Sequence, residues 1–235
     1  MFLSSSSIKL KLKDLLQLPS FWIVFFIIIR LYGITNPPLE VSHNWRQATG
    51  LMVARNFVEV DNNIFYPQID ITSGKSGVIG MEFPLLNYLH YLVALLFGYE
   101  HWYGRLINLL VSSLGIFFYS KIIEGWTNRK TALYSTLALL ASIWFAFSRK
   151  MMPDTFSVSL AIIGIYYINH YLNTKSVKHY ILGLAFFSLG LLAKIPAGIY
   201  IAPVLLILTA KKINNKNKLF ITAGSAFSLF MVFLW

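Results

Sequence analysis

A cluster of side chains that could bind an anion follows the first apolar run of the sequence. The segment "HNWRQATGLMVARNF" places His43, Arg46 and Gln47 within five residues. At 100° per residue along a helix, these side chains share a face with Gly50 and Ala54. A guanidinium group fits phosphate, and an imidazole can donate beside it. The pattern predicts an amphipathic helix along the membrane whose polar face binds an anion; a plain interfacial anchor is the alternative.

Two acidic residues stand at predicted helix starts. Glu82 directly precedes a Phe-Pro pair, and Asp154 follows a proline in "SRKMMPDTF", shortly after Arg149 and Lys150. A carboxylate beside two cations is suited to deprotonating a hydroxyl while a phosphate is held nearby. The alternative for both acids is a capping role at the start of a helix.

A single lysine, Lys194, interrupts the apolar sequence "LLAKIPAG". Because a lysine between membrane helices is costly unless it is paired, it indicates a functional site. The glycine-rich segment "SGKSGVIG" lacks the spacing and the Lys-Ser/Thr ending of a phosphate loop, so it predicts no nucleotide site. The sequence contains no cysteine, which excludes disulfide and thiolate chemistry.

The elements that must position these residues are membrane helices. The 235 residues are 57% hydrophobic and 12% charged, a composition typical of polytopic membrane proteins. Each crossing needs about 20 apolar residues. The runs that approach this length lie near Leu18–Ile34, Trp102–Ile123, Thr131–Phe147, Thr155–Leu172, Tyr180–Ala193, Ile195–Ala210 and Leu219–Trp235. The shorter run Phe83–Phe97 predicts a membrane-surface or re-entrant helix, and the first run is predicted to be a retained helix because no signal cleavage site follows it.

The net charge of +11 is distributed as an orientation signal. Lysines and arginines concentrate in every second segment between apolar runs: Lys9, Lys11, Lys13, Lys121, Arg129, Lys130, Lys175, Lys178, Lys211, Lys212, Lys216 and Lys218. This positive-inside pattern predicts a cytoplasmic amino terminus, membrane lipids as partners and no nucleic acid. Residues 35–101, 148–154 and 194–196 are then expected outside, and they hold seven of the nine acidic residues.

The order of these parts resembles the GT-C glycosyltransferases, and within them the protein O-mannosyltransferase and lipid A aminoarabinose transferase branch. The resemblance rests on weak motifs from Leu18 to about Pro203, of which "GRLINLL" around Arg105 and "LLAKIPAG" around Lys194 match most closely. It implies an all-α polytopic membrane fold with about seven transmembrane helices. Residues 1–235 are expected to form one domain, the amino-terminal part of a longer protein, with surface helices in the loop 35–101.

The resemblance also implies an activity: transfer of a sugar from a polyprenyl-phosphate donor to a lipid, protein or glycan acceptor. The reaction is expected on the outer face of a membrane, here a bacterial inner membrane. The expected phosphate-binding residues are Arg46, Arg105 and Lys194, with Gln47, Arg149 and Lys150 as further substrate-binding candidates. Asp154 or Glu82 is expected to act as the general base, and His43 to orient the donor or acceptor.

The sequence departs from the family pattern at two places. His43 and Asn44 stand where the branch usually has an Asp-Glu pair, and Glu82 begins a segment where it tends to have Lys-Pro-Pro-Leu. Either the acid has moved, to Glu82, Glu40 or Asp154, or the chain belongs to a subfamily with a different donor. Because Arg46 is retained, the second explanation is favoured.

The sequence also bears on metal use and on two other classes of function. Some relatives use a divalent metal ion, but distant carboxylates are not a metal signature. A transporter or flippase of a lipid-linked or anionic substrate is the alternative function, and the lack of an internal repeat disfavours it. A scaffold subunit without chemistry is a third class, in which the charged candidates would be replaceable.

Overall fold

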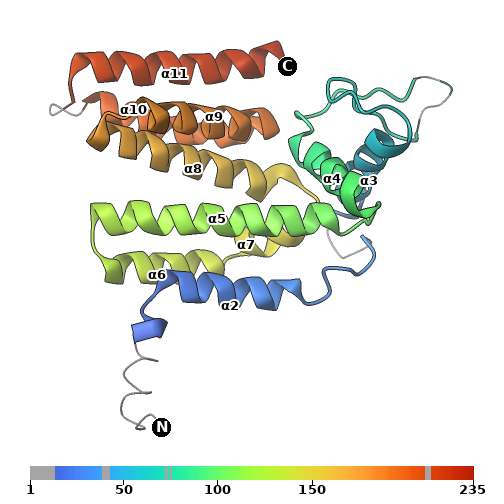
Figure 1. The fold of residues 1–235 in the computed structure, drawn as a ribbon, viewed down its shortest axis with the longest axis horizontal. Coiled ribbons are helices and arrows are strands. Elements are labelled where there is room, and N and C mark those ends of the chain that lie inside the picture. Colours follow the sequence, from blue (N-terminus) through green and yellow to red (C-terminus); the bar gives the residue numbers. More distant parts are fainter. Residues whose placement is uncertain (1–13, 39–42, 72–73, 75, 210–212) are drawn as a thin grey trace, which may run out of the picture.

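The fold is a stack of helices with a smaller helical layer at one end. The computed structural model describes residues 14–38, 43–71, 74, 76–209 and 213–235. Among these residues the only β pairing is an isolated bridge between Gln68 and Val78, so the all-α prediction is confirmed for the described part. Helices α3 (Asn44–Glu59) and α4 (Leu85–Phe97), with the loop that joins them, lie at one end of the stack (Figure 1).

The stack contains a helical segment for each long apolar run of the sequence. These segments are α2 (Pro19–Leu31), α5 (Tyr103–Trp126), α6 (Arg129–Leu140) with α7 (Ile143–Ala146), α8 (Pro153–Thr174), α9 (Val177–Ala193), α10 (Ile201–Thr209) and α11 (Asn215–Leu234). Of the described helices, α5 and α11 are long and apolar enough to cross a membrane, and α6 with Ile143–Arg149 adds a third crossing if this bent pair is one span. Seven crossings therefore stay a prediction.

Two of the apolar runs include a 3-10 helix, and one of them is also bent. After α6 the chain bends by 56°, and the Ser142 hydroxyl accepts a hydrogen bond from the Phe145 N–H at 3.4 Å to start α7, which runs into the 3-10 helix η1 (Phe147–Arg149). The other run begins as the 3-10 helix η2 (Ile195–Tyr200), with Pro196 in its first turn. A serine cap favours a new helix start inside the first of these runs, and Pro196 favours a helix start at the beginning of the second.

Close backbone contact joins α8 to α9. A Cβ on Gly164 would lie 2.8 Å from the backbone nitrogen of Phe187, and a Cβ on Gly190 would lie 2.8 Å from the carbonyl oxygen of Ser157. Small residues let membrane helices approach closely, which is a main source of their association. The contact fixes the start of α8 beside the end of α9.

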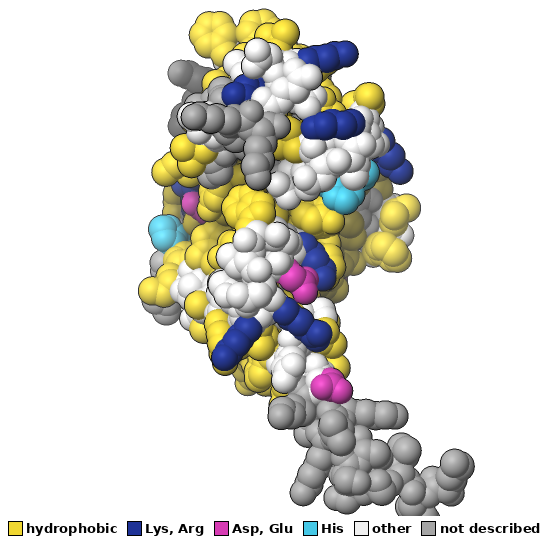
Figure 2. All heavy atoms as spheres, turned by 90° about the vertical axis from the view of Figure 1, so that its left-hand side faces the viewer, with side chains coloured by type: hydrophobic (Ala, Val, Ile, Leu, Met, Phe, Trp, Pro, Cys, Tyr) yellow, Lys and Arg dark blue, Asp and Glu magenta, His cyan; other side chains and the backbone are white. Residues whose placement is uncertain are grey.

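Charge is segregated between the two ends of the stack. The end of α5, the starts of α6, α9 and α11 and the turn between α8 and α9 lie at the left of Figure 1 and carry seven of the fourteen described lysines and arginines. Six of the eight described acidic residues lie toward the other end of the stack. Figure 2 views this end, where Lys and Arg side chains are spread among hydrophobic ones and few Asp or Glu are visible. The predicted separation of charge is thus found, while its orientation in a membrane stays a prediction. Several of the cations in the pattern, at 9–13 and 211–212, lie outside the described residues.

Candidate active site at the α3 and α4 end of the bundle

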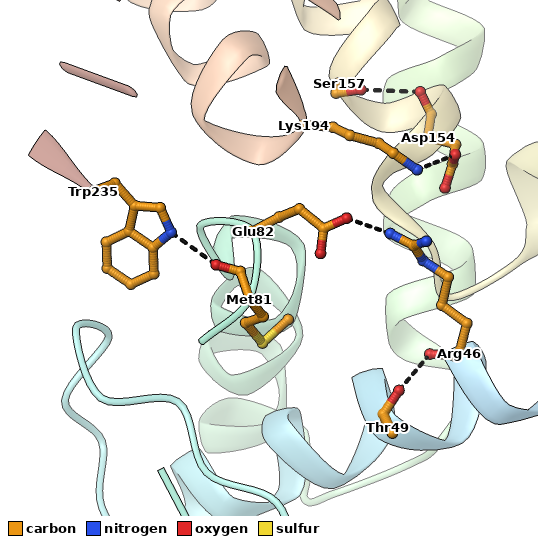
Figure 3. Close-up of polar contacts among 8 residues, drawn as sticks. All are labelled: Arg46, Thr49, Met81, Glu82, Asp154, Ser157, Lys194 and Trp235. Atoms are coloured by element: carbon orange, nitrogen blue, oxygen red, sulfur yellow. Dashed lines mark hydrogen bonds and ion pairs between the residues drawn. The ribbon is translucent and has the colours of Figure 1, made fainter. Parts of the chain in front are cut away.

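Two ion pairs lie close together where α8 begins and α9 ends (Figure 3). Arg46 in α3 pairs with Glu82 in the loop before α4. Lys194, which directly follows α9, pairs with Asp154 in the first turn of α8. The fold thus brings together four of the predicted site residues, from four separate segments of the chain.

Asp154 is held at the positive end of a long helix. Met152 is the extended N-cap residue of α8 and Pro153 is its first helical residue, so Asp154 lies in the first turn and is not the cap. A carboxylate in this position is stabilised by the helix dipole. One carboxylate oxygen contacts Lys194, whereas Oδ2 is buried without a hydrogen-bond partner. Asp154 therefore keeps a free acceptor next to a cation.

Lys194 is placed by the end of α9. Its backbone is extended, and its N–H donates to the Gly190 carbonyl oxygen at 3.1 Å as the helix ends. Only 15% of its side chain is exposed. Because a buried ammonium group needs a compensating charge, Asp154 is the partner that makes this position tolerable.

The loop that carries Glu82 is anchored first to α3. Arg55 forms an ion pair with Asp70, and the Asn56 side-chain amide donates to the Gln68 carbonyl oxygen at 3.0 Å and to Asp70 Oδ1 at 3.1 Å. These contacts hold the middle of the loop against the same helix that provides Arg46. A helix-capping role for Glu82 is not seen, since α4 starts at Leu85 and has no side-chain cap.

The same loop is anchored again on either side of Glu82. The Phe83 N–H donates to the Leu192 carbonyl oxygen in α9 at 3.2 Å. The Trp235 indole N–H donates to the Met81 carbonyl oxygen at 2.9 Å, and its ring meets Phe83 edge-on with centroids 5.0 Å apart. The backbone on either side of Glu82 is thus held by α9 and by Trp235, the residue after α11.

A cavity of about 400 Å³ opens beside the ion pairs. Arg46, Glu82, Thr49 and Asn87 supply its polar groups. Its apolar walls come from α3, α4 and the loop between them, with Met151 from the segment before α8; they include Val53, Ile69, Ile79 and Leu86. The adjoining Pro153 also lines it. This volume is in the range of pockets for small ligands.

Arg105, Arg149 and Lys150 lie away from this cavity. The buried Arg105 guanidinium donates to the carbonyl oxygens of Ile34, Asn36 and Pro37, at 3.1, 2.6 and 3.3 Å. Arg149 donates to the carbonyl oxygens of Tyr32 and Gly33, and the Lys150 ammonium lies 5.2 Å from the Phe147 ring centroid. The two arginines hold the chain that leaves α2, and a phosphate contact for any of the three stays a prediction.

His43 and Gln47 flank Arg46 but do not line the cavity. His43 is the N-cap residue of α3, with φ of 61°, and its ring lies 5.6 Å from the Phe147 ring centroid. Gln47 is completely buried, and its Oε1 accepts from the Met151 N–H at 3.4 Å. Their roles in substrate binding stay predictions. The further candidate Glu40 lies outside the described residues.

The site contains polar residues that the sequence reasoning missed. Asn87 was visible as an amide inside the apolar run of α4; it is buried and donates to the Gly50 carbonyl oxygen at 2.6 Å. Trp235 gave no such signal, because its neighbours in sequence are all apolar. No group of three or more His, Asp or Glu side chains that could hold a metal ion occurs among the described residues. Both site carboxylates are instead paired with cations.

Comparison with known families assigns the chain. A family model described as dolichyl-phosphate-mannose-protein mannosyltransferase matches residues 82–235. The chain belongs to this family. This match confirms the predicted resemblance to GT-C glycosyltransferases at the level of the family. The matched range includes Glu82, Asp154 and Lys194, and Arg46 lies outside it. This mannosyltransferase family and the apolar helices together indicate an integral membrane glycosyltransferase. No curated protein and no solved structure matches the chain.

Proposed function

We propose that this chain transfers a sugar from a polyprenyl-phosphate donor to an acceptor hydroxyl at the α3 and α4 end of the bundle. The observation that carries the proposal is that two ion pairs, Arg46 with Glu82 and Lys194 with Asp154, lie close together in a member of a mannosyltransferase family, and that Arg46 and Glu82 line a cavity there. The acceptor hydroxyl belongs to a lipid, a protein or a glycan, and the reaction takes place on the outer face of the membrane.

The charges in the site match the change of charge in this reaction. The acceptor oxygen attacks the anomeric carbon of the sugar, and the bond from that carbon to the phosphate oxygen breaks. The donor phosphodiester carries one negative charge, and the departing polyprenyl phosphate gains a second. Cations that contact the phosphate therefore stabilise the transition state more than the bound donor, which is the requirement for catalysis. We assign this role to Lys194 and Arg46.

Asp154 is the better candidate for the general base. Its Oδ2 is buried and accepts no hydrogen bond, so it can receive the proton of the acceptor hydroxyl as the new bond forms. Glu82 is held by Arg46 and by the anchored loop, an arrangement that orients the guanidinium. We place the sugar in the cavity beside Glu82, with the polyprenyl chain among the helices.

The experiment that tests the proposal is sugar transfer in membranes that contain the protein. A panel of radiolabelled polyprenyl-phosphate sugars, including hexoses and aminopentoses, serves as donors for the parent, Asp154→Asn and Lys194→Ala. General-base removal is expected to lower the rate of transfer at least about 100-fold. Lys178→Ala, an exposed lysine at the opposite end of the bundle, is the matched control and keeps the parent rate.

Two outcomes would contradict the proposal. Undiminished transfer by Asp154→Asn would remove this residue as the base. Lack of transfer from every donor, combined with movement of lipid-linked sugar across the bilayer, would favour a transporter.

A further inference from the structure

A second polar cavity lies at the opposite end of the bundle. It has a volume of about 530 Å³ and lies between the end of α8 and the starts of α9 and α11. Its polar lining consists of Tyr171, Lys175, Tyr180, Asn214, Lys216 and Asn217. Among the described residues, no acidic side chain lines it. The proposed transfer reaction makes no use of this cavity.

Some donors of this cavity already have partners: the Lys175 ammonium donates to the Leu172 carbonyl oxygen at 2.5 Å, and the Tyr180 hydroxyl donates to the Phe220 carbonyl oxygen at 2.8 Å. An ammonium group has three N–H donors, so Lys175 keeps two of them. Asn217 Oδ1 accepts from the Tyr171 hydroxyl at 3.2 Å, and Asn214 Oδ1 accepts from the Lys216 N–H at 3.0 Å. Both amides therefore keep their NH₂ groups for another partner. In the described part of the chain, neither Lys175 nor Lys216 forms an ion pair with a carboxylate.

A cavity with two ammonium groups, two amide donors and no carboxylate fits an anion with several acceptor oxygens, as in a phosphate group. Its surroundings indicate the source of that phosphate. The apolar Phe220 lines the cavity, and the neighbouring Leu219 is 70% exposed. Both belong to α11, one of the two described helices that are long and apolar enough to cross a membrane. A ligand in the cavity is thus beside the exposed apolar side chains of α11.

We propose that this cavity binds the phosphate headgroup of an anionic phospholipid, whose acyl chains lie along α11. The proposal does not depend on the transfer reaction. It also goes beyond a general attraction of basic side chains to the membrane surface, because other cations at the same end, such as Lys130 and Lys178, do not line the cavity. Basic pockets between membrane helices are known to hold lipid headgroups in this way.

The experiment measures lipid binding by the purified protein in detergent. Native mass spectrometry with added phosphatidylglycerol or phosphatidylcholine gives the bound lipid and its dissociation constant for the parent, Lys175→Gln, Lys216→Gln and the double variant. Each lysine near a headgroup contributes enough to change affinity about fivefold, so the double variant is expected to bind phosphatidylglycerol about 25-fold more weakly. Lys130→Gln is the matched control and is expected to bind like the parent.

Support requires one tightly bound phosphatidylglycerol in the parent, weaker binding in the two single variants and little binding of phosphatidylcholine. An equal loss in Lys130→Gln would overturn the site and leave only diffuse attraction. Equal binding of both lipids would overturn the role of charge. Displacement of the lipid by millimolar inorganic phosphate would identify a site for the free ion instead. Circular dichroism of each variant verifies that the helices are intact.

Discussion

Gly190 in α9 lies against Ser157 in α8, so close that a Cβ on residue 190 would be 2.8 Å from the Ser157 carbonyl oxygen. The two positions flank the site. Lys194 follows Gly190 by one helical turn, and its backbone N–H donates to the Gly190 carbonyl oxygen; the Ser157 hydroxyl donates to the Asp154 carbonyl oxygen at 3.0 Å. The contact between the helix backbones therefore sets the separation of Lys194 and Asp154.

Gly190→Ala is expected to destabilise the protein and to disturb this ion pair. The added methyl group meets backbone atoms, which cannot rotate away, and overpacking of this kind costs about 1–3 kcal/mol. Thermal unfolding in detergent micelles checks the prediction. Gly125→Ala, where a Cβ would meet nothing within 4 Å, is the control. Equal melting temperatures of the two variants would show that the close contact is not needed.

Glu82→Gln is expected to lower the rate of transfer about tenfold or more and to leave stability nearly unchanged. The side chains of Arg46 and Glu82 are 40% and 33% exposed, and pairs this accessible contribute at most about 1 kcal/mol to stability. The loss in rate is expected because the guanidinium is no longer oriented. Steady-state kinetics and thermal unfolding are measured on the same samples. If the melting temperature of Glu82→Gln falls so far that unfolding explains the lost activity, the role of Glu82 is structural only.

Trp235→Phe tests whether the indole hydrogen bond positions the loop around Glu82. The substitution keeps an aromatic ring beside Phe83 and removes the donor to the Met81 carbonyl oxygen. Hydrogen exchange of a peptide covering residues 79–84 is expected to become faster, because the loop opens more often. Phe233→Ala, at a side chain that is 86% exposed on the same helix, is the control. Unchanged exchange in Trp235→Phe would show that the other anchors are sufficient.

Arg105→Gln separates a structural role from phosphate binding. The buried guanidinium serves three carbonyl oxygens of the segment after α2, and leaving such groups unpaired costs about 1–3 kcal/mol. We expect a lower melting temperature, with the folded fraction retaining its rate of transfer. Arg129→Gln, an exposed arginine at the far end of the bundle, serves as control. A normal melting temperature with loss of transfer would instead support the phosphate contact predicted from sequence.

His90 is expected to make stability depend on pH. It is completely buried in α4, outside the candidate membrane spans, and its ring stacks on Tyr99 with centroids 5.1 Å apart. Burial lowers its pKa from 6.5 to about 4. The folded state therefore holds the neutral ring, and its stability is complete above pH 6.5 and lost as the pH falls toward 4, because the unfolded chain binds the proton more readily.

The lowered pKa of His90 corresponds to a loss of up to about 3 kcal/mol in the free energy of unfolding at low pH. His90→Phe keeps an aromatic ring at this buried position and removes the titration. The unfolding midpoint in urea, measured from pH 4 to 8, is expected to vary in the parent and to vary less in the variant. Parallel curves would assign the dependence to other groups.

Local patterns in the sequence determined the helical runs, the separation of charge along the chain and the unusual status of Lys194. Each follows from a physical rule with short range: apolar length for a membrane helix, the cost of an unpaired lysine, and the placement of basic residues beside one face of the membrane. Asp154 and Glu82 were found as carboxylates near helix starts, but their capping alternatives could be dismissed only when the first residues of α8 and α4 were known.

Only the tertiary structure decided which charges meet. Arg46 reaches Glu82 across 36 residues and Lys194 reaches Asp154 across 40, while Arg105 turns to backbone carbonyls that lie about 70 residues before it. In the sequence these cations look alike, since each is a lone positive charge beside an apolar run. Their partners depend on how the helices pack, and packing arises from contacts such as that of Gly190 with Ser157, which no local pattern reports.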